Sequence, residues 1–512
     1  MNGAESLVHS LLNSGVDTCF ANPGTSEMHF VAALDRIPGM RCVLGLAEGV
    51  VTGCADGYWR ISDKPAATLL HCGPGLANGL SNLHNAMRAR SGIVNIVGDQ
   101  ATHHRPLDAP LTADTEGWAR PVSAWVRTAR SAATVGHDGA VAVQAARTPP
   151  GQIATLILPA DTAWDEGGEV ADTLPVPASP QVAPNIVEQI ARVLREGRRT
   201  LIMVGGLGLR EAGLEAAHRI ASATGARLLA QQSNARIARG RGRAPIERMP
   251  YPVDAARGVT AGVEVVILAG ARRPVAFFAY PGKPSYLFPE DAAVHVLTRP
   301  EQDTVDALVK LADAIVAPQA AVPDAGPRSE PAQGKPEPER VARTLAAVMP
   351  EQAIVAEEAV SFGRGFFRYT HAAPPHDWLQ ITGGAIGCGF PLATGAAIAA
   401  PGRRVISLEA DGSAMYTVQA LWTQARERLD ITTIVFANRK YAILLGELAN
   451  VGANPGRTAL DMMDLGNPDL DWVRIASGMG VEGARAETCE QLADLLGSSF
   501  RRSGPFLIEL LI

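Results

Sequence analysis

The stretch VISLEADGSAMY, residues 405–416, joins an apolar run to a helix-like pattern through charged and small residues. The run ends at Glu409, Asp411 follows, and a charge at the end of a buried strand is costly unless something pairs with it. Gly412 allows the backbone to approach a ligand closely, and Ser413 suits the N-cap of the following helix. The stretch therefore predicts a strand whose end carries a carboxylate in need of a partner.

A second polar residue follows the next apolar run, ITTIVFAN, which ends at Asn438, 27 positions after Asp411. A strand, a crossover helix and a parallel return strand need about this length. Right-handed crossover brings the carboxyl ends of both strands to one edge of the sheet, where α/β domains bind ligands. Hard oxygen ligands beside a helix N-terminus describe a Mg²⁺ site that bridges to a phosphate group. The alternative is an Asp that caps a helix and an Asn in a turn, and the spacing alone leaves both open.

Short strand-like runs alternate with helix-like stretches of ten to fifteen residues, such as AMYTVQALWTQARER, along the whole chain. The runs are apolar on both faces and rich in β-branched residues, which is typical of central parallel strands. They are TCFAN, CVLGL, AATLLH, IVNIVG, ATLILPA, TLIMVGG, EVVILAG, AIVAEE, VISLEA, ITTIVFAN and FLIELL. This alternation predicts doubly wound α/β domains.

Two segments read as linkers, because residues 165–185 are rich in Pro, Gly and acids and residues 316–338 have a proline every few positions. They divide the 512 residues into three segments, which is also what the length suggests. The predicted domains are residues 1–165, 186–315 and 339–512.

Composition narrows the class of protein. The net charge of −6 and the pI near 6.0 give no reason to expect nucleic acid or an acidic membrane surface as a partner. The six cysteines are scattered without a C-x-x-C pair, so we expect reduced thiols in a cytoplasmic protein. No apolar run is long enough to span a membrane, and the N-terminal seventeen residues read as an amphipathic helix rather than a signal peptide.

Asp-Gly-Ser at 411–413, followed by Asn438 and then Tyr441-Ala442, resembles the diphosphate- and metal-binding motif of thiamine diphosphate enzymes. ADGSAMYTVQALWTQA is especially similar to benzoylformate decarboxylases and to large subunits of the acetolactate synthase type. The resemblance implies that Mg²⁺ binds Asp411, Asn438 and the backbone carbonyl of Lys440. It also places thiamine diphosphate against four further residues: Gly412, Ser413, Tyr441 and Ala442. One departure is Ala410, where the family motif has a glycine.

The stretch ITGGAIGCGFPLATGAAIA, from residue 381, resembles the family segment that holds the two rings of the cofactor. The resemblance implies that the Gly384 carbonyl accepts from the 4′-amino group and that Ile386 bends the cofactor into a V shape. Ser361, in EEAVSFGRG, falls where the family has a serine in contact with phosphate. A Gly/Ala-rich helix start is the plainer interpretation of the 381–399 stretch in isolation.

Glu48 follows an apolar run and opens a helix of small residues. The plain interpretation is an acid stabilised by a helix N-terminus, worth up to about 1 kcal/mol. The resemblance implies more, because Glu48 matches the glutamate that hydrogen-bonds N1′ of the aminopyrimidine and so promotes loss of the thiazolium C2 proton. In the family this glutamate and the metal-binding Asp come from different subunits. The resemblance therefore implies a homodimer or homotetramer with active sites between subunits.

The substrate side carries four candidates. His71 matches a family active-site histidine, Thr25 stands where benzoylformate decarboxylase has a carboxylate-binding serine, and His103 and His104 follow a strand and could reach the cleft. Other positions depart from the family: Leu444 replaces an acid found in pyruvate decarboxylases, and Phe277 stands near the place of a second active-site histidine.

The resulting expectation is a fold of three α/β domains with doubly wound parallel sheets: an N-terminal pyrimidine-binding domain, a degenerate nucleotide-binding middle domain and a diphosphate-binding domain. The middle domain, with only a weak G-x-G signal, is expected to hold nothing catalytic. The resemblance implies an enzyme that uses thiamine diphosphate and Mg²⁺ to decarboxylate a 2-oxo acid without oxidation, with carboligation onto an aldehyde or a second 2-oxo acid. The alternatives are an acetolactate synthase-type carboligase and a non-catalytic cofactor-binding or regulatory subunit.

Overall fold

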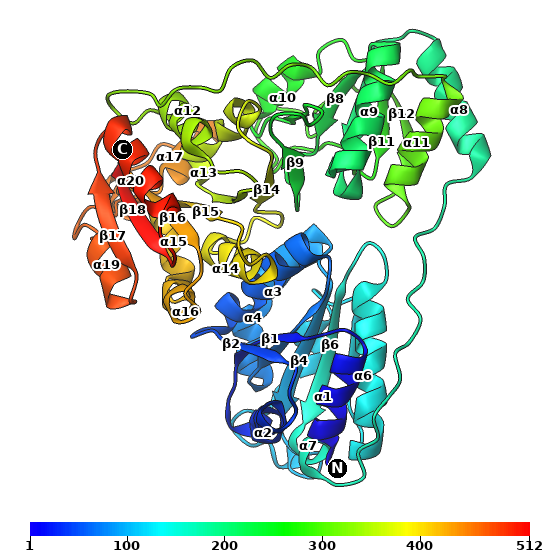
Figure 1. Cartoon of the computed structure of the whole chain (residues 1–512), viewed down its shortest axis with the longest axis vertical. Helices are drawn as coiled ribbons and strands as arrows, with labels where there is room; N and C mark the ends of the chain where they lie inside the picture. The colour runs from blue at the N-terminus through cyan, green and yellow to red at the C-terminus, as the bar shows by residue number, and fades with distance from the viewer.

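A computed structural model describes all 512 residues and shows three α/β units (Figure 1). The predicted fold of three doubly wound parallel-sheet domains is confirmed, and every run predicted to be a strand forms one. Residues 167–183 and 316–337 contain no helix or strand, and Figure 1 shows both as extended connections on the outside of the molecule. No helix combines the length and the apolar character that crossing a membrane requires.

The first unit is a six-stranded parallel sheet in the order β2-β1-β3-β4-β6-β5. Its strands are β1 (Thr18–Asn22), β2 (Arg41–Leu44), β3 (Ala66–Leu70), β4 (Ile93–Asp99), β5 (Trp125–Thr128) and β6 (Ile153–Pro159). Its helices are α1 (Gly3–Asn13), η1 (Thr25–Glu27), α2 (Met28–Arg36), α3 (Glu48–Ser62), α4 (Cys72–Ala89), η2 (Arg105–Leu107), α5 (Thr115–Ala119), α6 (Ala132–Arg147) and α7 (Ala160–Trp164). The strand order reverses between β1 and β3, so the loops after these two strands flank the crevice where such sheets bind ligands.

The middle unit has a five-stranded parallel sheet in the order β10-β8-β7-β11-β12. Its strands are β7 (Thr200–Val204), β8 (Arg227–Ala230), β10 (Glu247–Arg248), β11 (Val265–Ala269) and β12 (Ala293–Thr298). Its helices are α8 (Pro184–Arg195), η3 (Gly206–Leu209), α9 (Glu211–Thr224), α10 (Val253–Val259) and α11 (Thr304–Ala314). One strand of this segment, β9 (Ile237–Arg239), leaves the sheet and pairs antiparallel with β14 (His376–Gln380) of the third unit.

The third unit is a seven-stranded sheet in the order β17-β18-β16-β15-β13-β14-β9. Its other strands are β13 (Ile354–Glu358), β15 (Val405–Ala410), β16 (Ile431–Ala437), β17 (Glu482–Ala486) and β18 (Phe506–Leu511). Its helices are α12 (Pro338–Val348), α13 (Val360–Gly363), η4 (Phe366–Thr370), α14 (Gly389–Ala399), α15 (Asp411–Ala414), η5 (Met415–Thr417), α16 (Ala420–Arg426), α17 (Ala442–Asn450), α18 (Arg457–Asp461), α19 (Trp472–Gly478) and α20 (Cys489–Phe500). Here the strand order reverses between β13 and β15.

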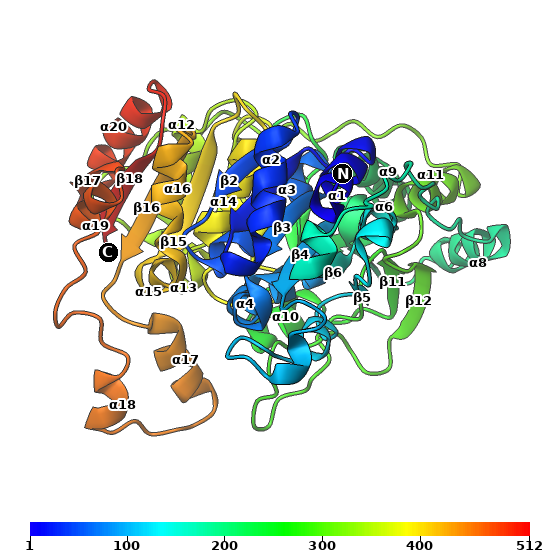
Figure 2. The ribbon, with the colours of Figure 1, turned by 90° about the horizontal axis from the view of Figure 1, so that it is seen from below.

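The prediction of a single helix over residues 414–428 is wrong. A short 3-10 helix, η5, lies between α15 and α16. The Thr417 hydroxyl donates to the Gly387 carbonyl at 2.9 Å, which ties this tight turn to the loop before α14. In Figure 2 the segment with α17 and α18 extends away from the sheets.

The first and third units meet through α3 and α14, which lie side by side in Figures 1 and 2. Glycines allow the contact: a Cβ on Gly57 would lie 2.1 Å from the Leu392 carbonyl oxygen, and one on Gly395 would lie 1.8 Å from the Cys54 carbonyl oxygen. This close packing fixes the first unit against the loop that precedes α14.

Candidate active site and cofactor site

The end of β15 meets the end of β16 at Asp411, as the spacing predicted. One oxygen of the Asp411 carboxylate accepts from the Gly412 N–H at 2.8 Å and the other from the Arg439 N–H at 2.6 Å. The side chain is buried and forms no ion pair. Burial raises the pKa of Asp411, although the backbone N–H groups oppose that shift by stabilising the charged form. A buried carboxylate without a cation is the arrangement that a metal ion would complete.

The turn after β16 contains the two other predicted metal ligands, the Asn438 side-chain oxygen and the Lys440 carbonyl oxygen. The side-chain oxygen of Asn438 accepts from the Lys440 N–H at 3.0 Å, and Arg439 between them has a left-handed φ of 57°. A carboxylate, an amide oxygen and a backbone carbonyl are the ligand types that Mg²⁺ prefers. The residues present therefore fit the magnesium ion that the sequence predicts.

Gly412 and Ser413 occupy the start of a short helix rather than its cap. The helix begins at Asp411, so its N-cap is Ala410 and the prediction that Ser413 is the N-cap is wrong. A Cβ on Gly412 would lie 2.4 Å from the ring of Tyr441, so only glycine fits beneath that ring. Burial raises the pKa of the Tyr441 phenol, and Ala442 after it opens α17.

The loop that carries Gly384 and Ile386 is folded by two left-handed glycines, Gly384 with a φ of 80° and Gly387 with a φ of 95°. A Cβ on Gly384 would lie 2.7 Å from the ring of Phe277, and one on Gly387 would lie 2.6 Å from Tyr416. Phe277, from the middle unit, therefore packs directly on the turn whose carbonyl is predicted to face the cofactor. Ile386 is half-buried.

Helix α4 of the first unit holds this loop through three side chains that the sequence did not reveal. Asn85 donates to the Ala385 carbonyl at 2.7 Å and accepts from the N–H groups of Gly383 and Ala385 at 3.1 and 3.2 Å. Asn82 donates to the Gly387 carbonyl at 3.2 Å, and a ring nitrogen of His84 lies 3.2 Å from the Gly383 carbonyl.

Two buried carboxyl groups lie under the start of α14. Glu358 accepts from the N–H groups of Gly387 and Gly389 at 2.8 and 2.7 Å, and burial raises its pKa to about 7. Glu409 faces the same region: it accepts from the Ser407 hydroxyl at 2.6 Å, and burial, with the neighbouring Glu358, raises its pKa. A Cβ on Gly389, the first residue of α14, would overlap the Glu409 carboxylate, so Glu409 points beneath α14 and not toward the edge where Asp411 lies.

Ser361 follows β13 across the point of strand-order reversal from Asp411. The residue before it, Val360, has a φ of 45°, which a β-branched side chain rarely adopts. Backbone strain of this kind persists where the surrounding structure requires it, often beside a ligand. This position suits the phosphate contact that the sequence predicts for Ser361.

Glu48 is the first residue of α3, and its carboxylate accepts from the Asn78 side chain at 3.2 Å. A Cβ on Gly75 would lie 3.1 Å from a carboxylate oxygen of Glu48 and 3.4 Å from the Cβ of His71, so Glu48 and His71 border the same glycine. Glu48 lies in the first unit and Asp411 in the third, and no hydrogen bond joins these two predicted site residues within one chain.

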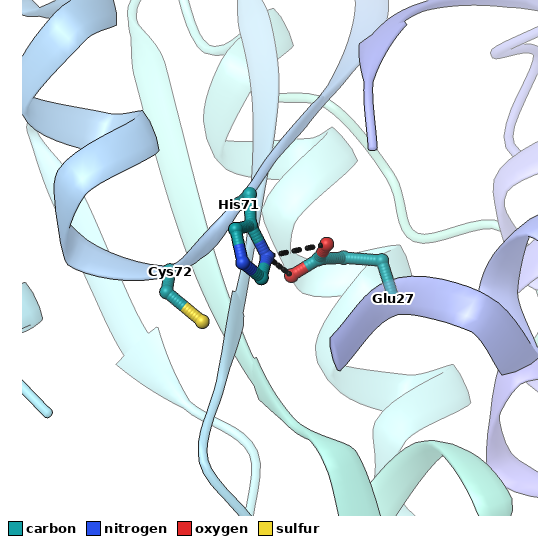
Figure 3. A group of neighbouring side chains, drawn as sticks. All are labelled: Glu27, His71 and Cys72. Atoms are coloured by element: carbon teal, nitrogen blue, oxygen red, sulfur yellow. Dashed lines mark hydrogen bonds and ion pairs between the residues drawn. The ribbon is translucent and has the colours of Figure 1, made fainter. Parts of the chain in front are cut away.

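His71 is the N-cap residue of α4 and pairs with a carboxylate that the sequence did not single out (Figure 3). Its Nδ1 lies 2.9 Å from Glu27, which is almost fully buried and also accepts from the Gly24 N–H at 2.7 Å. This pair fixes the orientation of the imidazole and leaves Nε2 for another partner. An acid three residues after a Pro-Gly turn was the only signal for Glu27, and nothing along the chain linked it to His71.

The four substrate-side candidates line one cavity of about 360 Å³, together with Cys72 and Trp164. Thr25 follows β1, His71 follows β3, and His103 and His104 follow β4, so the reversal of strand order brings them together. His103 is exposed, with 71 % of its side chain accessible, and its Nδ1 lies 3.9 Å from Asp161.

A second, larger cavity of about 740 Å³ lies between the middle unit and the other two. No residue predicted for the cofactor, metal or substrate lines it. Eight of its lining residues are arginines: Arg60, Arg88, Arg90, Arg147, Arg210, Arg236, Arg272 and Arg273.

Comparison with known proteins agrees with this geometry. Residues 1–118 match the N-terminal TPP-binding domain of thiamine pyrophosphate enzymes, and residues 361–510 match their C-terminal TPP-binding domain. A Mycobacterium tuberculosis protein named "Putative acetolactate synthase large subunit IlvX" is 51% identical, with 100% of this chain and 99% of the relative covered. The chain belongs to the thiamine pyrophosphate enzyme family.

Two further similar proteins are named as benzoylformate decarboxylases. The benzoylformate decarboxylase of Pseudomonas aeruginosa is 28% identical, with 98% of this chain and 96% of the relative covered. The solved 4-hydroxybenzoylformate decarboxylase of Rhodococcus jostii superposes with a TM-score of 0.85 at 23% identity, with 99% and 98% of the two chains covered. This thiamine pyrophosphate-dependent protein is therefore an enzyme of the acetolactate synthase and benzoylformate decarboxylase type.

Proposed function

We propose that the protein uses thiamine diphosphate and Mg²⁺ to cleave and form C–C bonds at 2-oxo acids, mainly by non-oxidative decarboxylation with carboligation as a companion activity. The observation that carries the proposal is the buried, unpaired carboxylate of Asp411 at the point of strand-order reversal, bonded to the turn that contains Asn438. A metal held by Asp411, Asn438 and the Lys440 carbonyl would place a diphosphate over Gly412, Ser413 and Ser361.

The ring end of the cofactor would lie along the Gly384–Ile386 turn, with Tyr441 and Ala442 closing the diphosphate end. Bound thiamine diphosphate would supply a nucleophilic thiazolium carbon and a cationic ring that accepts electrons as CO₂ leaves. The chain holds the Gly384 carbonyl still, because Asn85 and Glu358 bond the backbone on both sides of that turn.

Glu48 is proposed as the catalytic acid at N1′ of the aminopyrimidine. It opens α3 in the first unit, whereas Asp411 lies in the third, and we place the two in one site across a contact between subunits. A homodimer or homotetramer follows from this arrangement.

His71 and Thr25 are proposed to hold the substrate, with His103 and His104 at the rim of the same cavity. Thr25 has a hydroxyl that can donate to the substrate carboxylate. The Glu27 carboxylate orients His71, so that Nε2 can give or take a proton at the carbon atom that loses CO₂.

An acetolactate synthase-type carboligase is the second candidate, favoured by the relative of that name at 51% identity. A non-catalytic cofactor-binding or regulatory subunit is the third candidate. It is disfavoured because a protein that only binds the cofactor would not need the acid Glu48 beside His71 at the edge of the substrate cavity.

The test is CO₂ release with product analysis over a panel of 2-oxo acids, each with and without an acceptor aldehyde. We expect turnover that requires both thiamine diphosphate and Mg²⁺. Acetolactate from pyruvate alone as the main product would favour the second candidate. No turnover with any substrate would overturn the proposal in favour of the third.

A further inference from the structure

Three metal-ligating groups of different chemistry converge beside the 360 Å³ cavity, which His71 and Cys72 line and behind which Glu27 is buried. One ligand atom each from Glu27, His71 and Cys72 all lie within 4.8 Å of one another (Figure 3). The geometry points to a site for Zn²⁺ or a similar borderline cation at Glu27, His71 and Cys72, separate from the Mg²⁺ site proposed at Asp411.

Small shifts of the three ligand atoms would bring them to the separations of tetrahedral coordination. Zinc bonds of about 2.0–2.3 Å to oxygen, nitrogen and sulfur place neighbouring ligand atoms roughly 3.3–3.7 Å apart. The Glu27–His71 contact of 2.9 Å would widen slightly on binding, and the thiol would move inward. The Ser26 hydroxyl marks the point of convergence, because it lies 3.3 Å from His71 Nδ1 and 3.1 Å from Cys72 Sγ, and it also contacts Glu27.

The ligands are held by rigid elements rather than by mobile chain. Glu27 ends η1 and is fixed by the Gly24 N–H, while His71 and Cys72 are the N-cap and first residue of α4. Cys72 has a φ of 52°, a left-handed conformation that costs energy in a residue other than glycine. That conformation directs the buried thiol toward Ser26, as the 3.1 Å contact shows.

Charge also favours a cation at this point. Asp99 is fully buried on the same cavity wall and acts electrostatically on the Cys72 thiol, as Glu27 does. The nearest compensating charge is Arg105, 3.0 Å from Asp99 and partly open to solvent. Mg²⁺ avoids thiolate ligands, whereas Zn²⁺ accepts this mixture of oxygen, nitrogen and sulfur, and the cavity provides an entry path.

Binding would displace one proton, because the metal ligand is the thiolate and the Cys72 proton must leave to solvent. A bound Zn²⁺ at His71 Nδ1 would replace the contact of Nδ1 with Glu27 and would leave the proton of the ring on Nε2, which then could not accept another. Reversible inhibition by Zn²⁺ is therefore expected, and of the results predicted for this metal site only the inhibition rests on the proposed function of His71.

The experiment uses Co²⁺ as a spectroscopic probe on the full-length protein saturated with Mg²⁺ and thiamine diphosphate. We expect a thiolate-to-cobalt absorption band at one equivalent of Co²⁺ that Zn²⁺ removes. Cys72→Ser should abolish the band, and the matched control Cys42→Ser, at an exposed cysteine, should keep it. Glu27→Gln should weaken Co²⁺ binding by at least about 10–100-fold, the loss that even an outer-shell partner causes, and it also serves if Cys72→Ser fails to fold.

Absence of the band in the wild-type protein, or its persistence in Cys72→Ser, would overturn the metal site. If the band forms as expected but Zn²⁺ does not inhibit turnover, the metal site stands and the role proposed for His71 fails. If the protein shows no turnover at all, the proposed function fails while the band still decides the metal site.

Discussion

The carboxamide of Asn85 forms two hydrogen bonds with the backbone of Ala385: it donates to the carbonyl at 2.7 Å and accepts from the N–H at 3.2 Å. Because Asn85 also accepts from the Gly383 N–H, one side chain of α4 fixes the backbone on both sides of Gly384. The first unit of the chain thus sets the shape of the turn on which the third unit is proposed to hold the cofactor ring.

Asn85→Asp hardly changes the size of the side chain, but it should weaken cofactor binding. Aspartate loses the donor to the Ala385 carbonyl and places a negative charge beside it, which costs about 1–3 kcal/mol at a buried position. Calorimetry with saturating Mg²⁺ should show thiamine diphosphate binding about 5- to 150-fold weaker. Asn13→Asp makes the same change of charge at an exposed site and should bind normally. Equal affinities would show that the turn does not depend on Asn85.

Asp411→Ala should remove metal-dependent retention of the cofactor. The substitution deletes the proposed charged metal ligand and also the acceptor for the Gly412 and Arg439 N–H groups. Calorimetry in the presence of Mg²⁺ should show affinity reduced by at least about 100-fold, the loss of a charged ligand being worth roughly 3 kcal/mol or more. Asp494→Ala, at an exposed acid on α20, is the control. Retention unchanged in Asp411→Ala would place the metal elsewhere.

Glu48→Gln should separate cofactor binding from activation. Glutamine can still accept from Asn78, so α3 and the bound cofactor should stay in place, but it cannot supply the proton at N1′. Exchange of the thiazolium C2 proton for deuterium, followed by NMR, should slow about 10²- to 10⁴-fold. Exchange at the wild-type rate would show that Glu48 is not the acid.

The sequence revealed those parts of the site that depend on strand ends. Asp411 and Asn438 were predicted together because β15 and β16 are buried, apolar and joined by one crossover. The role of Asn85 was not predicted, because its partner Ala385 lies 300 positions away along the chain and an asparagine within a helix carries no local signal. Glu27 was missed for the same reason, because His71 is 44 positions further along the chain.

Two edge strands of the third sheet, β9 and β17, were likewise missed by the pattern. β17 reads EGARA, in which only Ala486 is buried, and β9 has only three residues. Neither shows the apolar character that marks a buried strand, and β9 forms only because β14 offers a free edge.

Packing between α3 and α14 predicts a contrast between two Gly→Ala variants. Gly57→Ala places a methyl group 2.1 Å from the Leu392 carbonyl oxygen, so the helices must separate at a cost of about 1–3 kcal/mol or more. Gly446→Ala, on the exposed face of α17, meets nothing within 4 Å and should gain up to about 1 kcal/mol of helix stability. Thermal unfolding should show a lower midpoint for the first variant and an unchanged or higher one for the second. Equal midpoints would contradict the close helix contact.

His376 should make stability depend on pH. Burial lowers its pKa to about 4, below the ordinary value of 6.5, although its Nδ1 lies 2.8 Å from the Pro374 carbonyl. Its other ring nitrogen is buried without a partner. Between pH 6.5 and about 4 the imidazole is protonated in the unfolded chain but stays neutral in the native protein. The free energy of unfolding therefore falls as the pH decreases from 6.5, and it levels off below about 4. One proton of difference changes the free energy of unfolding by about 1.4 kcal/mol per pH unit, and the total loss over this range is on the order of 3 kcal/mol.

His376→Asn isolates this contribution, because asparagine can keep the donor to Pro374 and does not titrate in this range. Carboxylates lower the stability of both proteins in acid, so the informative quantity is the difference between them. Thermal midpoints measured from pH 7 to pH 4 should decline less steeply in the variant, and the two curves should differ by the slope of one proton. Parallel curves would mean that the native protein accepts the proton on His376, and the burial of this imidazole would then not govern stability in acid.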